Sequence, residues 1–275
     1  MVLIDLHTHS TCSDGTLKPE ALVRAARSRK VSVLSLTDHD TTEGVPAFLS
    51  ACRHSGVKGL SGIELSAEAP YTLHILGYNI TPGNGPLEKR LERLREHRKD
   101  RNVAICQRLR ELGLDVALEE VEAEAGGEVI ARPHIARVLI RKGYVQDMAG
   151  AFRHFLADGA AAYIPRIRLS AEECIRLIRQ SGGVAVLAHP GQMGLDEPAL
   201  RGVLGELKEM GLWGLECLSS HHRYEEIYRY LKLAAEMGLY TTAGTDFHGW
   251  NRPGIQLGIP VSEDFLPWAR LQLAL

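Results

Sequence analysis

The chain has 275 residues, which is long enough for one α/β barrel or for a core domain that carries a smaller insert. Its 32 basic and 34 acidic side chains give a formal charge of −2, which argues against partners such as long nucleic acid or an acidic membrane. The five cysteines are scattered without a CxxC pair, so neither a disulfide framework nor a thiolate zinc site is expected. Any anionic ligand must therefore be held by local groups.

The N-terminal stretch MVLIDLHTHS predicts a strand and not a signal peptide, because Asp5 interrupts its apolar run and no basic lead precedes it. No segment approaches the roughly 20 consecutive apolar residues that a membrane span requires. A reducing cytoplasm is therefore the expected compartment.

Short β-branched runs alternate with helical patterns in both outer parts of the chain, which is the βαβα rhythm of a parallel sheet or barrel. In chain order the first part contains VLIDL, ALVRAARSRK, VSVLSLTDHD, VPAFLSACRHSG, VKGLSGIELS and the short strand TLHILGY. The last part contains AEECIRLIRQSGG, VAVLAHPG, a helical stretch at 198–210, WGLECLSS, YEEIYRYLKLAAEMG and LYTTAGTDFHG. Both parts are expected to belong to one α/β domain.

Between them, residues 86–158 read almost entirely as amphipathic helix, which predicts an inserted subdomain. Its joints are expected at PGNGP (82–86) and YIPRIR (163–168), which are rich in turn formers or proline. The predicted division is a first core part at 1–85, a helical insert at 86–164 and a second core part at 165–275.

Metal-capable side chains cluster where the predicted strands end, the edge at which an α/β barrel collects its functional groups. The nine candidates are His7, His9, Asp14, His39, Glu64, His74, His189, Asp246 and His248. The HxH spacing places two imidazoles on one face of a strand. Each histidine taken singly is more simply an ordinary polar residue. That interpretation does not explain why these gather at one edge while His54, His97 and His154 fall on predicted helices.

A ligand set of histidine and carboxylate without cysteine is typical of Mn²⁺, Fe²⁺ or catalytic Zn²⁺. Nine candidate ligands exceed the needs of one ion, so a cluster of two or three divalent ions is predicted, with Mn²⁺ preferred.

The ordered motifs DLHTHS, SDG, TDHD, GIE, HILGY, LAHP and GTDFHG resemble those of the PHP family, named after polymerases and histidinol phosphatases. The resemblance covers about residues 1–80 and 165–260. It implies a metal-dependent phosphoesterase on a distorted seven-stranded (β/α) barrel.

The same resemblance implies how the ligands are shared among ions. It assigns His7, His9, Glu64 and Asp246 to a first metal, then Asp14, His39 and His248 to a second, and Glu64, His74 and His189 to a third. One position departs from the commonest family form, which often has histidine in place of Asp14. A metal-bound hydroxide held by these ligands would attack phosphorus, and the general acid is left unassigned.

The insert, with ARPHIA at 131–136 and EHRKDRN at 96–102, resembles the subgroup of nucleoside 3′,5′-bisphosphate phosphatases, some members of which act as 5′ to 3′ exonucleases on short RNA. A second phosphate would need cations away from the metals. The candidate substrate-binding residues are Arg98, Lys99, Arg101, Arg132, His134 and His221. A solvated, charge-rich helix explains the insert's basic residues about equally well.

The expected activity is removal of the 3′-phosphate from a nucleoside 3′,5′-bisphosphate. Open alternatives are exonuclease action on short RNA, histidinol phosphate phosphatase, and a non-catalytic metal-binding regulatory domain. An amidohydrolase-type barrel is disfavoured because Glu64, and not a lysine, occupies the ligand end of the third predicted strand. Trp213 and Trp250 are interpreted as packing residues in preference to a stacking platform for a base.

Overall fold

The computed structural model describes residues 1–83, 85–125, 130–265 and 271. The chain divides into two compact units, one formed by Met1–Arg90 with Arg168–Leu275 and the other by Leu91–Ile167. The first unit contains the whole β-sheet and the second is helical.

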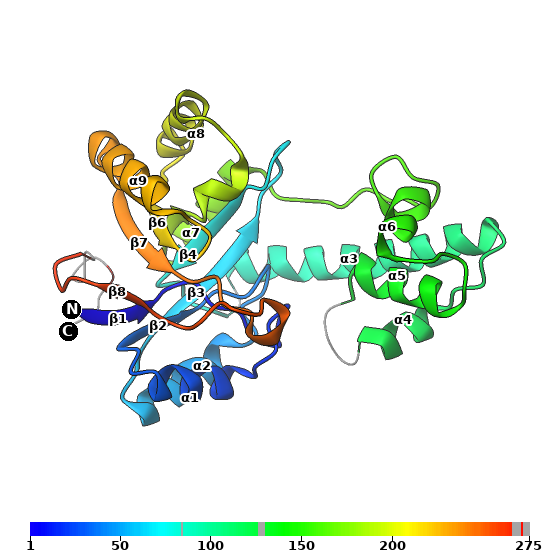
Figure 1. Cartoon of the computed structure of the whole chain (residues 1–275), viewed down its shortest axis with the longest axis horizontal. Coiled ribbons are helices and arrows are strands. Elements are labelled where there is room, and N and C mark those ends of the chain that lie inside the picture. The colour runs from blue at the N-terminus through cyan, green and yellow to red at the C-terminus, as the bar shows by residue number, and fades with distance from the viewer. Residues whose placement is uncertain (84, 126–129, 266–270, 272–275) are drawn as a thin grey trace. The chain divides into compact units, whose positions relative to one another are not determined.

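The first unit is an α/β fold built on a nearly closed barrel of strands (Figure 1). The strands are β1 (Val2–Asp5), β2 (Val33–Leu36), β3 (Lys58–Ser66), β4 (His74–Tyr78), β5 (Val184–Leu187), β6 (Gly214–Ser219), β7 (Tyr240–Gly244) and β8 (Ile259–Val261). Their order in the sheet is β7-β6-β5-β4-β3-β2-β1-β8. The segment that follows β1 also meets β7, since the backbone N–H of Leu6 donates to the carbonyl of Ala243 at 3.0 Å. This contact brings the barrel close to closure.

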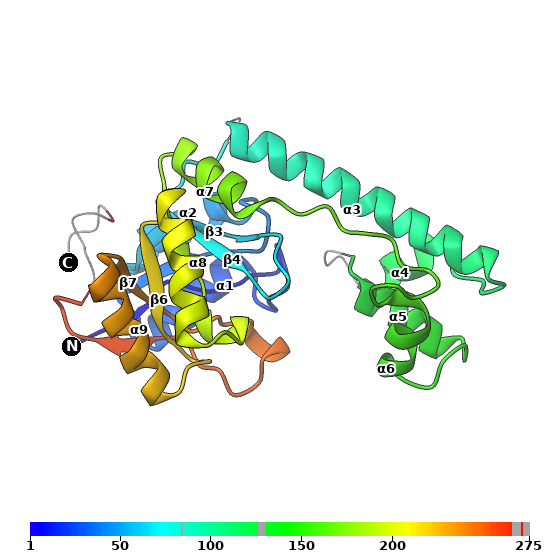
Figure 2. The same cartoon turned by 90° about the horizontal axis from the view of Figure 1, so that it is seen from above.

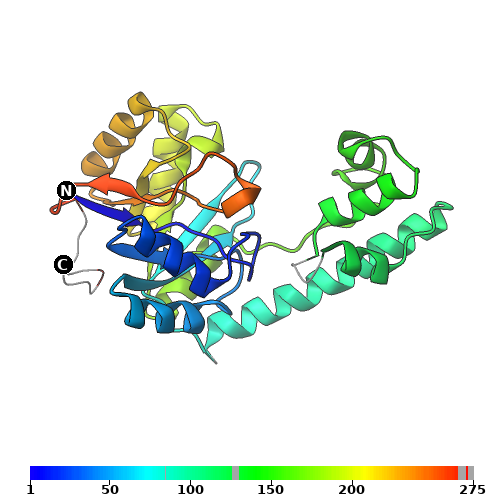
Figure 3. The same ribbon diagram turned by 60° about the horizontal axis from the view of Figure 1, so that its bottom comes forward.

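Two strands differ from the prediction of seven strands in a parallel pattern. The described residues contain an eighth strand, β8, which pairs antiparallel with the start of β1 beside the N-terminus (Figure 3). At three residues with Pro260 at its centre, β8 carries too weak a pattern to be read from sequence. Strand β4 runs antiparallel to both β3 and β5. Its first residue, His74, therefore lies at the edge where the neighbouring strands end.

Helices cover the outside of the barrel, with α1 and α2 on one side and α8 and α9 on another (Figures 1 and 2). The helices of this unit are α1 (Pro19–Ser28), α2 (Val45–Ser55), α7 (Ala171–Gln180), α8 (Glu197–Glu209) and α9 (Tyr224–Met237), with short turns η2 (Pro190–Met193) and η3 (Gly249–Asn251). Local signals fix their ends: Ser170 and Asp196 cap the starts of α7 and α8, and Gly56 ends α2 at φ 78°.

Two apolar clusters hold the first unit together. One fills the barrel and includes Ile4, Leu6 and Tyr78, all of which are fully buried. The other joins α1 and α2 to the sheet through residues such as Leu22 and Phe48. Each such side chain contributes about 1.5–3 kcal/mol by leaving water, which gives the site a rigid support.

The second unit contains most of α3 (Pro86–Glu111), together with α4 (Leu118–Ala125), α5 (Arg132–Arg141), α6 (Met148–Ala151) and the π-helix η1 (Phe152–Leu156). Its own apolar cluster includes Ile105, Leu109, Val138 and Leu139. Helix α3 begins at residue 86, where the insert was predicted to start, but the contact boundary falls inside this helix, after Arg90. In the described part of the chain no helix has the length and apolar character needed to cross a membrane.

Candidate metal centre

All nine predicted ligands lie at one edge of the barrel. His7, His9 and Asp14 follow β1, His39 follows β2, Glu64 lies within β3, His74 opens β4, His189 follows β5, and Asp246 and His248 follow β7. Three overlapping groups among them bring ligand atoms within 4.8 Å of one another. Six strands of the barrel, or the loops that follow them, thus deliver their polar side chains to one place.

The first group consists of His7, His9, Glu64 and Asp246, all buried. His9 Nε2 lies 3.3 Å from Glu64 Oε2 and 3.2 Å from Asp246 Oδ1. His7 Nε2 lies 3.3 and 3.5 Å from the same two oxygens. Two imidazole nitrogens and two carboxylate oxygens therefore converge, and this group equals the first predicted ligand set.

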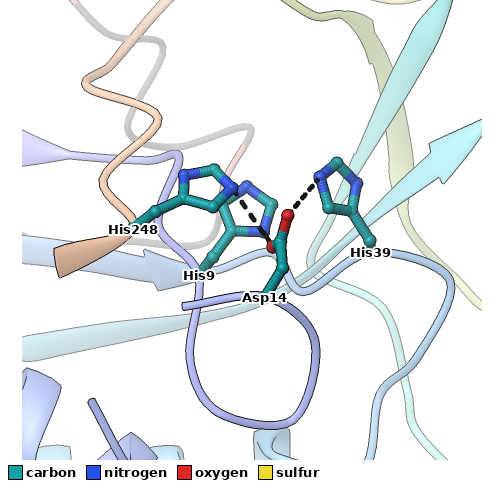
Figure 4. Close-up of side chains that lie close together, drawn as sticks. All are labelled: His9, Asp14, His39 and His248. Carbon is teal, nitrogen blue, oxygen red and sulfur yellow. Dashed lines mark ion pairs between the residues drawn. The ribbon is translucent and has the colours of Figure 1, made fainter. Parts of the chain in front are cut away.

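The second group gathers His9, Asp14, His39 and His248 around one carboxylate (Figure 4). Asp14 Oδ1 lies 3.1 Å from His248 Nε2, and Asp14 Oδ2 lies 3.7 Å from His39 Nε2. The group contains the predicted second set and adds His9. The Asp14 side chain is 53% exposed, whereas His9 and His248 are buried, so this side of the cluster faces solvent.

The third group is His39, Glu64 and His74, in which His39 takes the place predicted for His189. His39 Nδ1 lies 2.9 Å from Glu64 Oε2, and His74 Nδ1 lies 2.9 Å from Glu64 Oε1. His189 is close as well, with Nε2 3.0 Å from Glu64 Oε1, although it does not belong to this group. Glu64 contacts all three of these histidines.

The donor set fits divalent cations. Several buried atoms in the described part of the chain lie close to one another at the cluster but have no partner in hydrogen-bonding geometry: His7 Nε2, both ring nitrogens of His9, His39 Nδ1, Glu64 Oε2, Asp246 Oδ1 and His248 Nε2. Buried polar atoms are normally paired, and leaving one unpaired costs about 1–3 kcal/mol. Cations bound by these atoms would remove that cost, and nitrogen and carboxylate donors suit Mn²⁺, Fe²⁺ or Zn²⁺.

Electrostatics keep the central carboxylate ionised. Burial alone would raise the pKa of Glu64, but His39 and His7 outweigh it and hold that pKa well below its usual range. Burial and the neighbouring charged His39 together lower the pKa of His9 to about 3. Burial also disfavours the charged form of His39, yet Glu64 outweighs this and raises the pKa of His39 to about 9. A metal binding at His39 must therefore displace a proton.

A buried carboxylate that sequence reasoning missed stands behind His7. Glu216 Oε1 accepts a hydrogen bond from His7 Nδ1 at 3.0 Å, and Glu216 Oε2 accepts one from the backbone N–H of His189 at 2.7 Å. The first bond leaves His7 Nε2 free to act as a ligand. The available signal was a lone acidic residue within the apolar run WGLECLSS, since unpaired carboxylates are almost never fully buried.

Two other buried aspartates fix the loops that carry ligands. Asp38 accepts hydrogen bonds from the backbone and hydroxyl of Ser10 and from the hydroxyl of Ser13, which shapes the loop before Asp14. Asp5 accepts hydrogen bonds from the backbone and hydroxyl of Thr245, next to Asp246. Burial raises the pKa of Asp5 to about 6 although these donors oppose it.

Arg252 is a second residue that sequence reasoning missed. Its Nη1 donates to Asp246 Oδ2 and to His221 Nε2, and His221 Nε2 also lies 3.1 Å from Asp246 Oδ2. His221 therefore reaches the rim of the centre from the loop after β6. The signal for Arg252 was its position in the loop after β7, six residues beyond Asp246 at the ligand-bearing edge.

Two of the predicted ligands have a strained backbone. His189 and Asp246 adopt φ values of 24° and 57°, in the left-handed region that residues with a side chain rarely occupy. Strain of this kind costs about 1–3 kcal/mol and is found mainly where a side chain must be held in a functional orientation.

The other five predicted substrate residues lie in the second unit. Arg101 and Arg132 are brought together around Tyr163, with guanidinium carbons 6.0 and 5.9 Å from the ring centroid. Burial lowers the pKa of Arg101, and the adjacent Arg132 lowers it further. His134 is buried, and its Nδ1 accepts the backbone N–H of Ala131 at the start of α5.

The remaining two, Arg98 and Lys99, lie on α3, and Lys99 is exposed. Of the five, only Arg101 and Arg132 are thus shown close to each other by a shared contact.

Comparison with known proteins agrees with this geometry. The PHP domain model matches residues 5–126. A 3′,5′-nucleoside bisphosphate phosphatase from Chromobacterium violaceum is 32% identical over 98% of this chain and 95% of its own length. The chain belongs to the PHP family. It is therefore a metal-dependent phosphoesterase, a hydrolase of phosphoric esters.

Other relatives that this chain matches over most of their length are named for different activities. The 5′-3′ exoribonuclease Rnm of Escherichia coli is 34% identical over 94% of this chain and 90% of its own length. A phosphoribosyl 1,2-cyclic phosphate 1,2-diphosphodiesterase from Eggerthella lenta is 32% identical over 89% and 94%.

Solved structures show the same fold. An amidohydrolase from C. violaceum, solved with bound sulfate and no metal, covers 98% of this chain and 95% of its own at 31% identity and a TM-score of 0.80. A protein from Bifidobacterium adolescentis described as a metal-dependent phosphoesterase covers 94% and 92% at 30% identity and a TM-score of 0.76.

Proposed function

We propose that this PHP protein removes the 3′-phosphate of a nucleoside 3′,5′-bisphosphate, for example converting adenosine 3′,5′-bisphosphate into AMP and phosphate. The observation that carries the proposal is the cluster of metal-capable side chains at one edge of the barrel, with Arg252 in contact with Asp246 at its rim. A guanidinium group matches phosphate oxygens with two parallel hydrogen bonds. The full-length similarity to a bisphosphate phosphatase supports the same substrate class.

The nine-residue cluster would hold two or three divalent ions, with Mn²⁺ the first choice and Fe²⁺ or Zn²⁺ the alternatives. When bound, such ions supply a water of lowered pKa and neutralise charge on the phosphoryl oxygens. Glu64 would bridge ions, because its two oxygens face different histidines. Asp14 marks the open side, since its side chain is 53% exposed, so the phosphate ester would approach past this residue.

The protein's own residues then orient the phosphate ester. Arg252 uses Nη1 on Asp246 and His221, and its side chain is 34% exposed. Among the described residues, its Nε and Nη2 have no hydrogen-bond acceptor, so these donors remain for a phosphoryl oxygen. Burial of Glu64, His7 and His9 excludes bulk water from the inner side of the cluster, which strengthens each charge interaction there.

The runner-up is 5′ to 3′ exonuclease action on short RNA. The relatives named for the two activities have nearly equal identity to this chain, 32% and 34%, each over more than nine-tenths of it. Both substrates present a terminal phosphate beside a ribose, so one centre suits both.

An assay on defined phosphate esters tests the proposal. Protein purified with Mn²⁺ is given adenosine 3′,5′-bisphosphate, AMP, histidinol phosphate and a short 5′-phosphorylated RNA, and released phosphate and mononucleotides are measured. We expect rapid, chelator-sensitive release of phosphate from the bisphosphate. Faster turnover of the RNA would favour the exonuclease. Release from histidinol phosphate alone would overturn the nucleotide substrate class, and inactivity on all four would favour a regulatory metal-binding domain.

A further inference from the structure

An indole ring stands in solvent beside the metal centre. Trp250 lies in the turn η3 and is 85% exposed. Trp213, in contrast, is half-buried and stacks on Tyr240 with ring centroids 4.4 Å apart. The packing role expected for both tryptophans from the sequence thus holds for Trp213 and not for Trp250. A large aromatic side chain left in water next to a functional site points to an intermolecular contact.

The backbone that carries Trp250 is fixed in place. Its own N–H donates to Thr16 Oγ1 at 3.0 Å, and the side chain of Asn251 donates to the carbonyl of Asp14 at 2.8 Å. Gly249 has φ 66°, and a Cβ there would meet Thr16 Oγ1 at 2.0 Å, so only glycine allows this close approach. The turn is therefore locked to the loop that bears Asp14.

Both ends of the turn are also joined to the cluster. His248, two residues before Trp250, lies 3.1 Å from Asp14 through Nε2. Arg252, two residues after it, is paired with Asp246. Trp250 is thus flanked on one side by the predicted ligand His248 and on the other by Arg252, which contacts the predicted ligand Asp246. A phosphate ester held at the centre would carry its alcohol group within reach of this rim.

We propose that Trp250 binds the nucleobase of the substrate by stacking, so that η3 forms a base subsite adjoining the phosphate subsite. A stacking surface tolerates every base, since each presents a flat aromatic face. About a tenfold gain in affinity lies in the lower half of the range known for such stacking. Because the turn is already rigid, little ordering accompanies binding. This inference rests on the nucleotide substrate class given under Proposed function.

The test compares a nucleotide with the same sugar phosphate lacking a base. The substrates are adenosine 3′,5′-bisphosphate and 1-O-methylribose 3,5-bisphosphate, and the variants are Trp250→Ala and Trp250→Phe. We expect Trp250→Ala to lower the ratio of the two kcat/KM values about tenfold, mainly through KM for the nucleotide. Trp250→Phe keeps an aromatic face and should recover most of the ratio. Tyr228→Ala, which removes a 70% exposed ring from α9, is the control and should leave the ratio as in wild type.

Equilibrium binding gives a second readout that needs no turnover. AMP added to metal-free protein should quench part of the tryptophan fluorescence, and that part should be absent from Trp250→Phe. An unchanged ratio together with unchanged quenching overturns the subsite. A Trp250→Ala variant that keeps the ratio but loses self-association in sedimentation would also overturn it, in favour of a contact between copies.

Failure of the proposed function looks different. In that case wild-type protein turns over neither bisphosphate, while the fluorescence comparison still reports whether Trp250 meets a base. Because Trp250 is exposed, we expect both variants to keep the melting temperature of the wild type, which verifies that they fold.

Discussion

The buried carboxylate of Glu216 decides which ring nitrogen of His7 is available as a ligand. Because Glu216 Oε1 accepts a hydrogen bond from His7 Nδ1–H, His7 Nε2 is directed at Glu64 and Asp246. We expect Glu216→Gln to weaken metal binding by about 10- to 100-fold, since the amide places a donor where two N–H groups need acceptors. Competition with a fluorescent chelator measures this affinity.

The control for this change is Glu209→Gln, which removes the same charge from an exposed position at the end of α8. Its metal affinity should equal that of the wild type. A Glu216→Gln variant with normal affinity and a lowered melting temperature would show that this carboxylate serves only the packing of β6.

Arg252 is expected to bind the phosphoryl group with the donors that Asp246 and His221 leave unused. We expect Arg252→Ala to raise KM, and the inhibition constant of inorganic phosphate, by about 10- to 100-fold, as for the loss of a charge-assisted hydrogen bond. Arg252→Lys should lie between, because it keeps the charge and loses the planar fork. Steady-state kinetics with phosphate as inhibitor checks both values.

Arg27→Ala serves as the matched control, because it removes a positive charge from the last turn of α1, which faces the other end of the barrel. If Arg252→Ala lowers kcat and metal content but leaves phosphate inhibition unchanged, Arg252 acts only by holding Asp246.

Single residues differ in how far the sequence revealed them. The predicted ligands could be found because polar groups at strand ends converge in a barrel, whatever the details of packing. His39 is grouped with Glu64 and His74 because an isolated β-bridge pairs the backbone of His39 with that of Glu64 just after β2. The spacing of residues in the sequence does not predict this bridge. Arg252 was missed because its contact with Asp246 is formed by the path of a loop.

At the scale of elements, closure of the barrel between β1 and β7 depends on a glycine. A Cβ at Gly244 would lie 2.3 Å from the Cβ of His7 and 2.8 Å from Glu216 Oε1. We expect Gly244→Ala to separate the segment after β1 from β7, costing about 1–3 kcal/mol of folding free energy. The same shift should move His7 and lower metal affinity. Urea unfolding and chelator competition measure the two effects.

Gly205→Ala, in the middle of α8, is the matched control, since no atom lies within 4 Å of the added Cβ. Alanine there should stabilise the protein by about 0.5–1 kcal/mol through helix propensity. A Gly244→Ala variant as stable as this control would contradict the tight approach of β1 and β7.

The direction of elements was harder to predict than their existence. Strand β4 was read as a short strand, and only the pairing registers show that it is antiparallel to β3 and β5. That direction places His74, the first residue of β4, at the ligand edge. The sequence analysis therefore predicted His74 as a ligand without the geometric reason for its position. Alternation of apolar residues specifies which face of a strand is buried and does not specify the strand's direction.

At the scale of the whole molecule, each unit has an apolar cluster of its own among the described residues. The clusters around Tyr78 and Phe48 contain only residues of the barrel unit, and the cluster around Val138 contains only residues of the helical unit. The nine predicted ligands all belong to the barrel unit. Cation binding should therefore stabilise one core and leave the stability of the other nearly unchanged.

Hydrogen exchange with and without a chelator tests this separation. Cations present at 100 times their dissociation constant stabilise the state that binds them by about 2.7 kcal/mol, which slows exchange through opening of the site about a hundredfold. We expect chelation to remove that protection from amides that join the ligand loops, such as His9 N–H, which donates to Phe247, and Thr16 N–H, which donates to His248. Amides of α5 should exchange at the same rate in both conditions. Equal loss of protection in α5 would mean that the two units open as one cooperative body, because the helical unit contains none of the nine predicted ligands through which cations could stabilise it directly.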